Sequence, residues 1–249
     1  MRLRFLTYNI HRAIGVDRRF RPQRIARILA DHDADIVLLQ EVDDGVPRSR
    51  ELDLARELAD ALGYPHYAVG HNVSLRKGRY GNATLSKYPI MRERNIDLTI
   101  GRRKRRGCQH TSIVVEKISG HPHRLEVFNL HLGLSARERQ RQSGLLARSH
   151  ELVDLASDAA CLLGGDFNDW RLLLRAFFVE GLNFRCATDR PTRRGLRVIK
   201  TYPSFSPRGG LDRLYFRGPL RLVSVHACRH QMARAASDHL PVVADFELT

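Results

Sequence analysis

Short polar pairs follow several apolar runs of the sequence, and they contain residue types that transfer protons or bind metal ions. In three pairs one apolar residue separates the polar ones: Asn9-Ile10-His11, Asn129-Leu130-His131 and Asp166-Phe167-Asn168. Because side chains alternate between the two faces of a β-strand, both polar members of a pair point to one side. One such ending is commonplace, since Asn and Asp often end strands and begin turns. Their repetition in one chain predicts a shared polar site.

Further carboxylates and a histidine lie at the ends or beginnings of other apolar runs. Glu41 ends the run that starts at Ile36, Asp212 opens another run, and Asp238 and His239 precede a third. Between antiparallel neighbours the start of one strand lies beside the end of the next, so all these residues can meet at one rim of a sheet. Adjacent strand residues point to opposite faces, so we expect Asp212, and not Asp238, to orient the imidazole of His239.

The candidate residues are dominated by oxygen donors, which favour Mg²⁺ or Mn²⁺ over zinc. The donors are Asn9, Glu41, Asp166, Asn168 and Asp238. Two histidines, His131 and His239, add groups that transfer protons or donate to an oxyanion. The sequence contains no GxxxxGK[ST] phosphate loop, no GxSxG elbow and no HExxH motif. The remaining chemistry is metal-assisted attack of water on a phosphorus centre.

Many short strands with few inserted helices predict an α+β sandwich that spans residues 1–249 as a single domain. The expected strands are Leu3–Tyr8, Asp35–Leu39, Ala83–Ser86, Ser112–Glu116, Leu125–Leu130, Ala160–Gly164, Leu211–Phe216, Leu220–His226 and Pro241–Phe246. Helices are expected to begin at Pro22, Ser49, Ala136 and Trp170. The third helix would carry a stripe of Leu145, Leu146, Leu152, Val153 and Ala156, and Trp170 is interpreted as a core residue. The similarity of Tyr8-Asn9-Ile10-His11 to Phe128-Asn129-Leu130-His131 suggests two related halves.

The composition is that of a globular protein with an excess of positive charge. The 249 residues include 42 Lys and Arg against 27 Asp and Glu, a net charge of +15. Such a field attracts nucleic acid, anionic lipid headgroups or phosphorylated metabolites, although arginine-rich chains also arise from GC-rich genomes. The four cysteines form no close pairs, and no apolar run suits a signal peptide or a transmembrane segment. These features predict a cytoplasmic protein with reduced thiols.

The motifs together resemble the endonuclease/exonuclease/phosphatase superfamily, in particular its deoxyribonuclease and sphingomyelinase-like branch and its small bacterial hydrolases. They occur in the family's order between residues 5 and 246: Thr7-Tyr8-Asn9, Leu39-Gln40-Glu41-Val42, Tyr80 to Ile90, Asn129-Leu130-His131, Gly165-Asp166-Phe167-Asn168, Leu211-Asp212-Arg213 and Ser237-Asp238-His239-Leu240-Pro241. The resemblance implies a four-layered α/β sandwich of two packed mixed β-sheets flanked by helices, with the active site at one rim.

The resemblance also implies a role for each matched residue. Glu41, Asn9 and Asp238 match the metal site. Asp166 matches the residue that orients or deprotonates the attacking water, and Asn168 the residue that positions the water or phosphate. His239 matches the catalytic histidine, Asp212 its carboxylate partner, and His131 the second histidine of the deoxyribonuclease branch. That second histidine has a Glu partner in the family, but this chain offers only Tyr80 and Asn82 in the corresponding region.

Other residues are expected to contact substrate. His11 would contact phosphate or cap the end of its strand, and Asn82 lies in the family's third motif. The basic segment Arg102, Arg103, Lys104, Arg105 and Arg106 would track phosphates or form a solvated loop.

The sequence thus predicts a Mg²⁺- or Mn²⁺-dependent phosphodiesterase with nucleic acid as its leading substrate. The alternatives are a phospholipid or sphingomyelin headgroup phosphodiesterase, an inositol phosphate phosphatase acting on small phosphate esters, and a catalytically silent binding module. His131 and His11 disfavour the abasic-site endonuclease branch, which carries other residues at both positions.

Overall fold

The strands form two six-stranded sheets and a two-stranded ribbon. The computed structural model describes residues 1–118, 121–193 and 195–249. The first sheet has the order β13 (Leu220–Ala227), β14 (Val242–Leu248), β1 (Arg2–Asn9), β2 (Ile36–Asp44), β4 (Arg79–Ser86) and β3 (His66–Ser74). The second has the order β5 (Ile90–Asp97), β6 (Gly107–Ile118), β7 (His121–His131), β8 (Ala160–Asp166), β12 (Asp212–Arg217) and β9 (Arg185–Cys186). The ribbon pairs β10 (Asp189–Thr192) with β11 (Gly195–Val198).

The two sheets repeat one arrangement. In each, the third and fourth strands form a parallel pair, β1 with β2 and β7 with β8, and the other neighbours are antiparallel. The echoed segments that begin at Tyr8 and Phe128 end the equivalent strands β1 and β7. The weak sequence repeat therefore coincides with a structural one.

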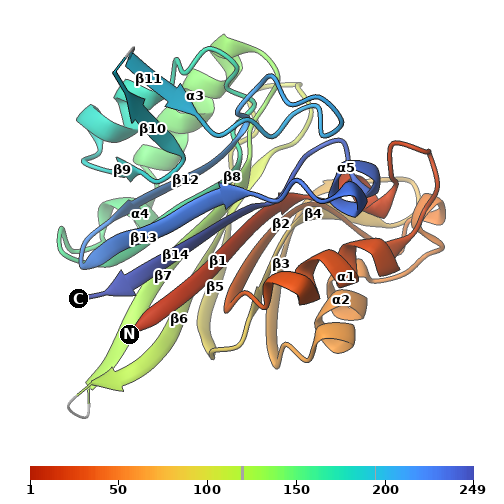
Figure 1. Cartoon of the computed structure of the whole chain (residues 1–249), viewed down its shortest axis with the longest axis horizontal. Coiled ribbons are helices and arrows are strands. Elements are labelled where there is room, and N and C mark those ends of the chain that lie inside the picture. The colour runs from red at the N-terminus through yellow and green to blue at the C-terminus, as the bar shows by residue number, and fades with distance from the viewer. Residues whose placement is uncertain (119–120, 194) are drawn as a thin grey trace.

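The sheets pack face to face, with helices on both outer surfaces, which confirms the expected four-layered sandwich (Figure 1). Helices α1 (Pro22–His32), α2 (Leu54–Leu62) and α5 (Gln231–Ala236) cover the first sheet. Helices α3 (Ala136–Ala147) and α4 (His150–Val153) and the single turn η3 (Phe177–Gly181) cover the second. No helix in the described ranges is long and apolar enough to cross a membrane.

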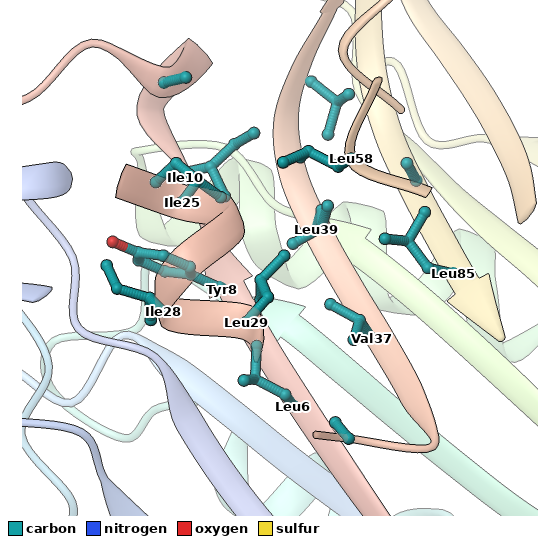
Figure 2. Packing of buried hydrophobic residues seen from close by; sticks show 14 of the residues in the cluster. Leu6, Tyr8, Ile10, Ile25, Ile28, Leu29, Val37, Leu39, Leu58 and Leu85 are labelled. Carbon is teal, nitrogen blue, oxygen red and sulfur yellow. The ribbon is translucent and has the colours of Figure 1, made fainter. Parts of the chain in front are cut away.

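Alternation along the strands builds the layers. In β1, Leu3 and Phe5 belong to the core between the sheets, while Leu6 and Tyr8 belong to the core under the helices. Figure 2 shows the second group, where Leu6 and Tyr8 lie beneath Ile28 and Leu29 of α1. Burying a Leu or Phe side chain in this way contributes roughly 1.5–3 kcal/mol. Two apolar faces on one strand thus require a partner layer on each side.

Two expected helix starts were wrong. Ser49 does not begin a helix but ends the short 3₁₀ turn η2 (Pro47–Ser49). Helix α2 begins at Leu54, and the side chain of Asp53 before it accepts a hydrogen bond from the backbone N–H of Arg56 at 3.1 Å. Asp53 is the true N-cap, because its carboxylate satisfies a free N–H of the first turn. The chain after Trp170 forms irregular turns, and Leu172 in this segment has a positive φ of 59°. The starts at Pro22 and Ala136 are confirmed.

Some expected boundaries and elements also differ. The stripe assigned to the third helix is split, because α3 ends at Ala147 and a second helix starts at His150, which leaves Val153 62% exposed. Strand β2 extends beyond Leu39 to Asp44. The strands β3, β5, β9, β10 and β11 were missed. The sequence of β5 is Ile-Met-Arg-Glu-Arg-Asn-Ile-Asp, which lacks an apolar pattern because an exposed edge strand needs few apolar residues.

Candidate active site

One cavity lies where the carboxyl ends of the two parallel strand pairs meet. Asn9 ends β1, Glu41 lies in β2, His131 ends β7 and Asp166 ends β8. Asp212 opens β12 directly opposite Asp166 in the antiparallel register. The cavity has a volume of about 240 Å³ and is lined by Asn9, Glu41, Lys104, Arg106, His131, Leu134, Asp166, Asn168, Trp170, Tyr202, Leu211, Asp238 and His239.

The structure brings His239 and Asp212 together as a buried, hydrogen-bonded pair. Nδ1 of His239 lies 2.9 Å from Oδ2 of Asp212, which also accepts a hydrogen bond from the hydroxyl of Thr201. Burial opposes the charged imidazole, but the carboxylates of Asp212 and Asp166 outweigh it and raise the pKa of His239 well above its ordinary value. The two carboxylates thus favour the protonated ring, whose Nε2 can donate a hydrogen bond.

Asp166 lies at the centre of the cavity. Its Oδ2 accepts a hydrogen bond from Nδ2 of Asn9 at 3.0 Å and lies 3.4 Å from Nε2 of His131 and 3.6 Å from Nε2 of His239. Its Oδ1 accepts from the backbone N–H of Asn168 at 2.9 Å. Burial raises the pKa of Asp166 above the ordinary range for a carboxyl group, although the imidazolium of His239 opposes the shift. A carboxylate of raised basicity suits the removal of a proton from water.

Local backbone geometry aims two of these side chains. The pairing of β2 with β4 shifts between Leu39 and Val42, and Glu41 in this bulge has a φ of 56°. A bulge re-aims a side chain relative to the regular pleat. Asn168 likewise has a φ of 51°, and its Nδ2 donates to the carbonyl of Leu132 at 3.0 Å. Such left-handed positions are uncommon for non-glycine residues and often occur at functional sites.

The oxygen donors fit a hard divalent cation. Glu41, Asn9 and Asp238 line the cavity together, and carboxylate and amide oxygens are the ligands that Mg²⁺ and Mn²⁺ prefer. Oε2 of Glu41 pairs with Nε of Arg12 at 3.2 Å. A second group, Asp166, Asp212 and His239, has ligand atoms within 4.8 Å of one another. In this second group, Nδ1 of His239 is hydrogen-bonded to Asp212 and is not free to bind a metal. The group is therefore better suited to proton transfer than to metal binding.

Of the other histidines and amides predicted for the site, His131 lines the cavity, whereas His11 and Asn82 do not. The imidazole of His131 lines the cavity, and burial, together with Arg106 and His239, lowers its pKa well below the ordinary value, which favours the neutral ring. His11 does not line the cavity, although its Nδ1 lies 4.0 Å from Asp238. Asn82 is also outside the lining: its Nδ2 donates to the carbonyls of Gly107 and Asn129 at 3.2 and 3.0 Å. It joins the sheets instead of facing a substrate.

The basic segment divides in the same way. Lys104 and Arg106 line the cavity, and the ammonium of Lys104 also lies 5.3 Å from the ring centroid of Tyr80. Arg103 pairs with Glu138 of α3 at 3.3 Å. Arg102 and Arg105 are exposed and do not line the cavity.

Several residues that line the cavity or contact its lining residues were not anticipated. Arg12 pairs with Glu41, Thr201 bonds Asp212, and the ring of Tyr202 packs on that of His239 with centroids 4.9 Å apart. Of these residues, only Arg12 could have been recognised from the sequence, because it directly follows the polar pair Asn9-Ile10-His11. Trp170, interpreted as a core residue, is 52% exposed and lines the cavity.

Comparison with known proteins agrees with this architecture. The chain is 31% identical over 252 residues to the Escherichia coli (strain K12) protein described as "Uncharacterized protein YbhP", a match that covers 98% of this chain and 95% of that protein. An endonuclease/exonuclease/phosphatase from Bacteroides vulgatus has a TM-score of 0.78 at 19% identity and is covered completely, as is this chain. The human Nocturnin catalytic domain with bound sulfate has a TM-score of 0.78 at 20% identity, with 100% of this chain and 94% of that chain covered.

The two packed sheets and the acid–base groups at their common rim define a hydrolase fold. The chain belongs to the Endonuclease/Exonuclease/phosphatase family, whose sequence profile matches residues 6–239. Relatives in this family are nucleases and phosphatases that hydrolyse phosphate esters, and divalent metals generally assist them.

Proposed function

We propose that the protein is a Mg²⁺- or Mn²⁺-dependent phosphodiesterase that hydrolyses nucleic acid by in-line attack of water. The observation that carries this proposal is the convergence of Asp166 and the His239–Asp212 pair with the oxygen donors of Glu41 and Asp238 in one cavity. A module that only bound its partner would not need this complete set. A cytoplasmic location remains part of the proposal.

Asp166 is the group proposed to position and deprotonate the water. Its Oδ2 accepts a hydrogen bond from Nδ2 of Asn9, and its Oδ1 is held by the N–H of Asn168. The carboxylate is thereby fixed while remaining part of the cavity surface. Asn168 then supplies an amide beside the same position, and Arg106 supplies positive charge to a phosphate oxygen.

His239 is proposed to stabilise the charge that develops on the phosphate. Its Nδ1–H donates to Asp212, so the Nε2–H faces the cavity. A charge-assisted donor in a dry site gains strength when the phosphorus oxygens become more negative in the transition state. The neutral His131 contributes a second polar contact to the same region.

The cation is proposed to bind at Glu41, Asn9 and Asp238. When bound, it would act as a Lewis acid that neutralises negative charge on the phosphate. Arg12 pairs with Glu41 at 3.2 Å, which places its guanidinium beside the proposed cation site, where it could also contact a phosphate oxygen of the substrate.

Nucleic acid is the preferred substrate on electrostatic grounds. The net charge of +15 attracts a polyanion, and Lys104 and Arg106 bring two cations to the cavity itself. Phospholipid headgroups and small phosphate esters are the other substrate classes that the test must separate.

The test is relaxation of supercoiled plasmid with Mg²⁺ or Mn²⁺. We expect nicking that EDTA abolishes and that His239→Ala reduces at least about 100-fold, the scale on which general acid–base groups contribute. His150→Ala is the matched control, because this histidine is exposed on α4 and does not line the cavity. Equal nicking by the wild type and His239→Ala would contradict the assignment of the site. Metal-dependent hydrolysis of a headgroup diester or a phosphomonoester, without nicking, would contradict nucleic acid as the substrate.

A further inference from the structure

An exposed aromatic side chain lies at the mouth of the catalytic cavity. Trp170 lines the cavity together with Asp166 and Asn168, yet 52% of its surface is exposed. It is the only tryptophan of the chain. A large apolar ring that remains open to solvent beside reacting groups offers a face on which a planar ligand group can pack.

The backbone that carries Trp170 is anchored from below. The neighbouring Asp169 is buried, and its Oδ2 accepts a hydrogen bond from the backbone N–H of Leu174 at 2.8 Å. Its other oxygen lies 3.7 Å from Nη2 of Arg139 in α3. This carboxylate closes the turn between residues 169 and 174 and fixes the point from which the indole leaves the chain.

The segment from Tyr202 to Gly209 packs against the indole of Trp170. The rings of Trp170 and Tyr202 are perpendicular, at 89°, with centroids 5.5 Å apart. A Cβ at Gly209 would come within 2.6 Å of Cζ3 of the indole, so glycine is what lets the ring lie there. Tyr202 and Gly209 are themselves joined by backbone hydrogen bonds of 2.8 and 3.0 Å. The ring is therefore preorganised before any ligand arrives, which lowers the entropic cost of binding.

This support connects the indole to the reacting groups. Tyr202 packs on Trp170 with one side and on His239 with another, with ring centroids 4.9 Å apart in the second contact. The same cavity contains Lys104 and Arg106, whose charges suit a phosphate. A ligand that satisfies both features carries an aromatic ring beside its phosphate.

We infer that Trp170 is a substrate-binding residue that stacks on a nucleobase adjacent to the scissile phosphate. This inference rests on the proposed phosphodiesterase function and specifies how that site recognises its substrate. Stacking on an indole is tolerant of base identity, because every base has a π face. The residue therefore favours nucleic acid over diesters without rings and places little restriction on sequence.

The single tryptophan makes stacking directly measurable. In the Glu41→Gln variant, where we expect no turnover, Trp170 fluorescence should be quenched by a short oligothymidylate. An oligomer of the same length built from abasic sites has the same phosphates and should quench much less. Equal quenching by both oligomers would overturn the inference. A blue shift on anionic phospholipid vesicles, with no response to the base-bearing oligomer, would also overturn it and assign the ring to a bilayer.

Kinetics supply the second measurement. Trp170→Ala should raise KM at least about 5-fold for the base-bearing oligomer and leave KM for the abasic one unchanged, while Trp170→Phe should restore most of the affinity. Leu173→Ala is the matched control, because Leu173 is 58% exposed in the same turn but does not line the cavity. If Trp170→Ala hydrolysed the base-bearing oligomer with an unchanged KM, the stacking inference would be refuted, but the proposed function would stand. Absence of metal-dependent hydrolysis of any diester by the wild type would refute the proposed function instead.

Discussion

At the scale of single residues, the site brings buried carboxylates and a histidine close enough to form ion pairs. Asp166, Asp212 and His239 are all nearly completely buried, and a buried charge is costly unless it is paired. The imidazolium of His239 supplies that pairing for both carboxylates, at 2.9 and 3.6 Å. Asp166 and His239 therefore each influence the pKa of the other, and the carboxylate of Asp212 raises both.

Asp212→Asn should lower both the turnover number and the pKa of His239. Apart from the penalty of burial, Asp212 has the largest influence on this pKa, and it raises it. Without that carboxylate the imidazolium should lose its proton at a lower pH, and the alkaline limb of the pH–rate profile should move in the same direction. NMR titration of the His239 ring measures the pKa directly, and kcat should fall about 100-fold or more.

Asp245→Asn is the control, because Asp245 is a carboxylate that pairs with Arg2 and Arg4 and does not line the cavity. It should leave the pKa of His239 in place. If Asp212→Asn also left that pKa unchanged, the two groups would not form the acid–base pair described above.

Sequence reasoning found residues that follow strands and missed those that depend on tertiary packing. Asp166 and His131 were recognisable because periodicity places polar residues at strand ends on one face. Thr201 and Tyr202 lie on a loop, about ten residues before Asp212, and no local pattern connects them with it. Trp170 was misjudged because a tryptophan is highly buried on average. The place of this indole depends on the close approach of Gly209, which no local sequence pattern shows.

At the scale of elements, a polar network joins the two sheets beneath the site. Asn129 of β7 donates from Nδ2 to the carbonyls of Leu39 in β2 and Ala83 in β4, at 3.1 and 2.9 Å. Its Oδ1 accepts from Nε2 of Gln40 at 2.8 Å, and Asn82 of β4 donates to its backbone carbonyl. The sequence indicated that Asn129 and His131 share a face, but not that Asn129 binds the opposite sheet. That contact depends on which sheets pack together, which periodicity does not determine.

Asn129→Leu should therefore lower the free energy of unfolding by about 2–4 kcal/mol, because Gln40 and two carbonyls would lose buried partners. Urea denaturation measures the change. Asn95→Leu is the matched control: the same substitution on exposed β5 also removes two hydrogen bonds, to His71 and Asn72, but leaves their groups in contact with water. We expect a loss of less than about 1 kcal/mol there. Equal losses in both variants would mean that the network beneath the site adds nothing beyond ordinary surface contacts.

At the scale of the whole molecule, the chain closes on itself through its first sheet. Strand β1 pairs with β14, so that Arg2 lies opposite Glu247, and the two termini lie side by side (Figure 1). The second sheet is formed almost entirely by the middle of the chain, from residue 90 to residue 217. One apolar core, with members such as Phe5 and Leu214, belongs to both sheets. The active site likewise takes residues from both, so it exists only when the sheets are packed together.

We therefore predict that residues 1–249 unfold as one cooperative unit, although proteins of this length often show intermediates. If the second sheet unfolded alone, the core that it shares with the first sheet would be exposed to water. Asp166 and Asp212 would also be separated from the site residues of the first half, Asn9 and Glu41, and from His239. In thermal unfolding, far-UV circular dichroism should follow both sheets, and the fluorescence of Trp170 should follow the rim where they meet. The two curves should coincide, and the calorimetric and van't Hoff enthalpies should agree. Asn129→Leu should lower the temperature of this transition without dividing it. A fluorescence change that precedes the loss of strand signal would instead mean that the sheets separate first, and that the active site is less stable than the layers that build it.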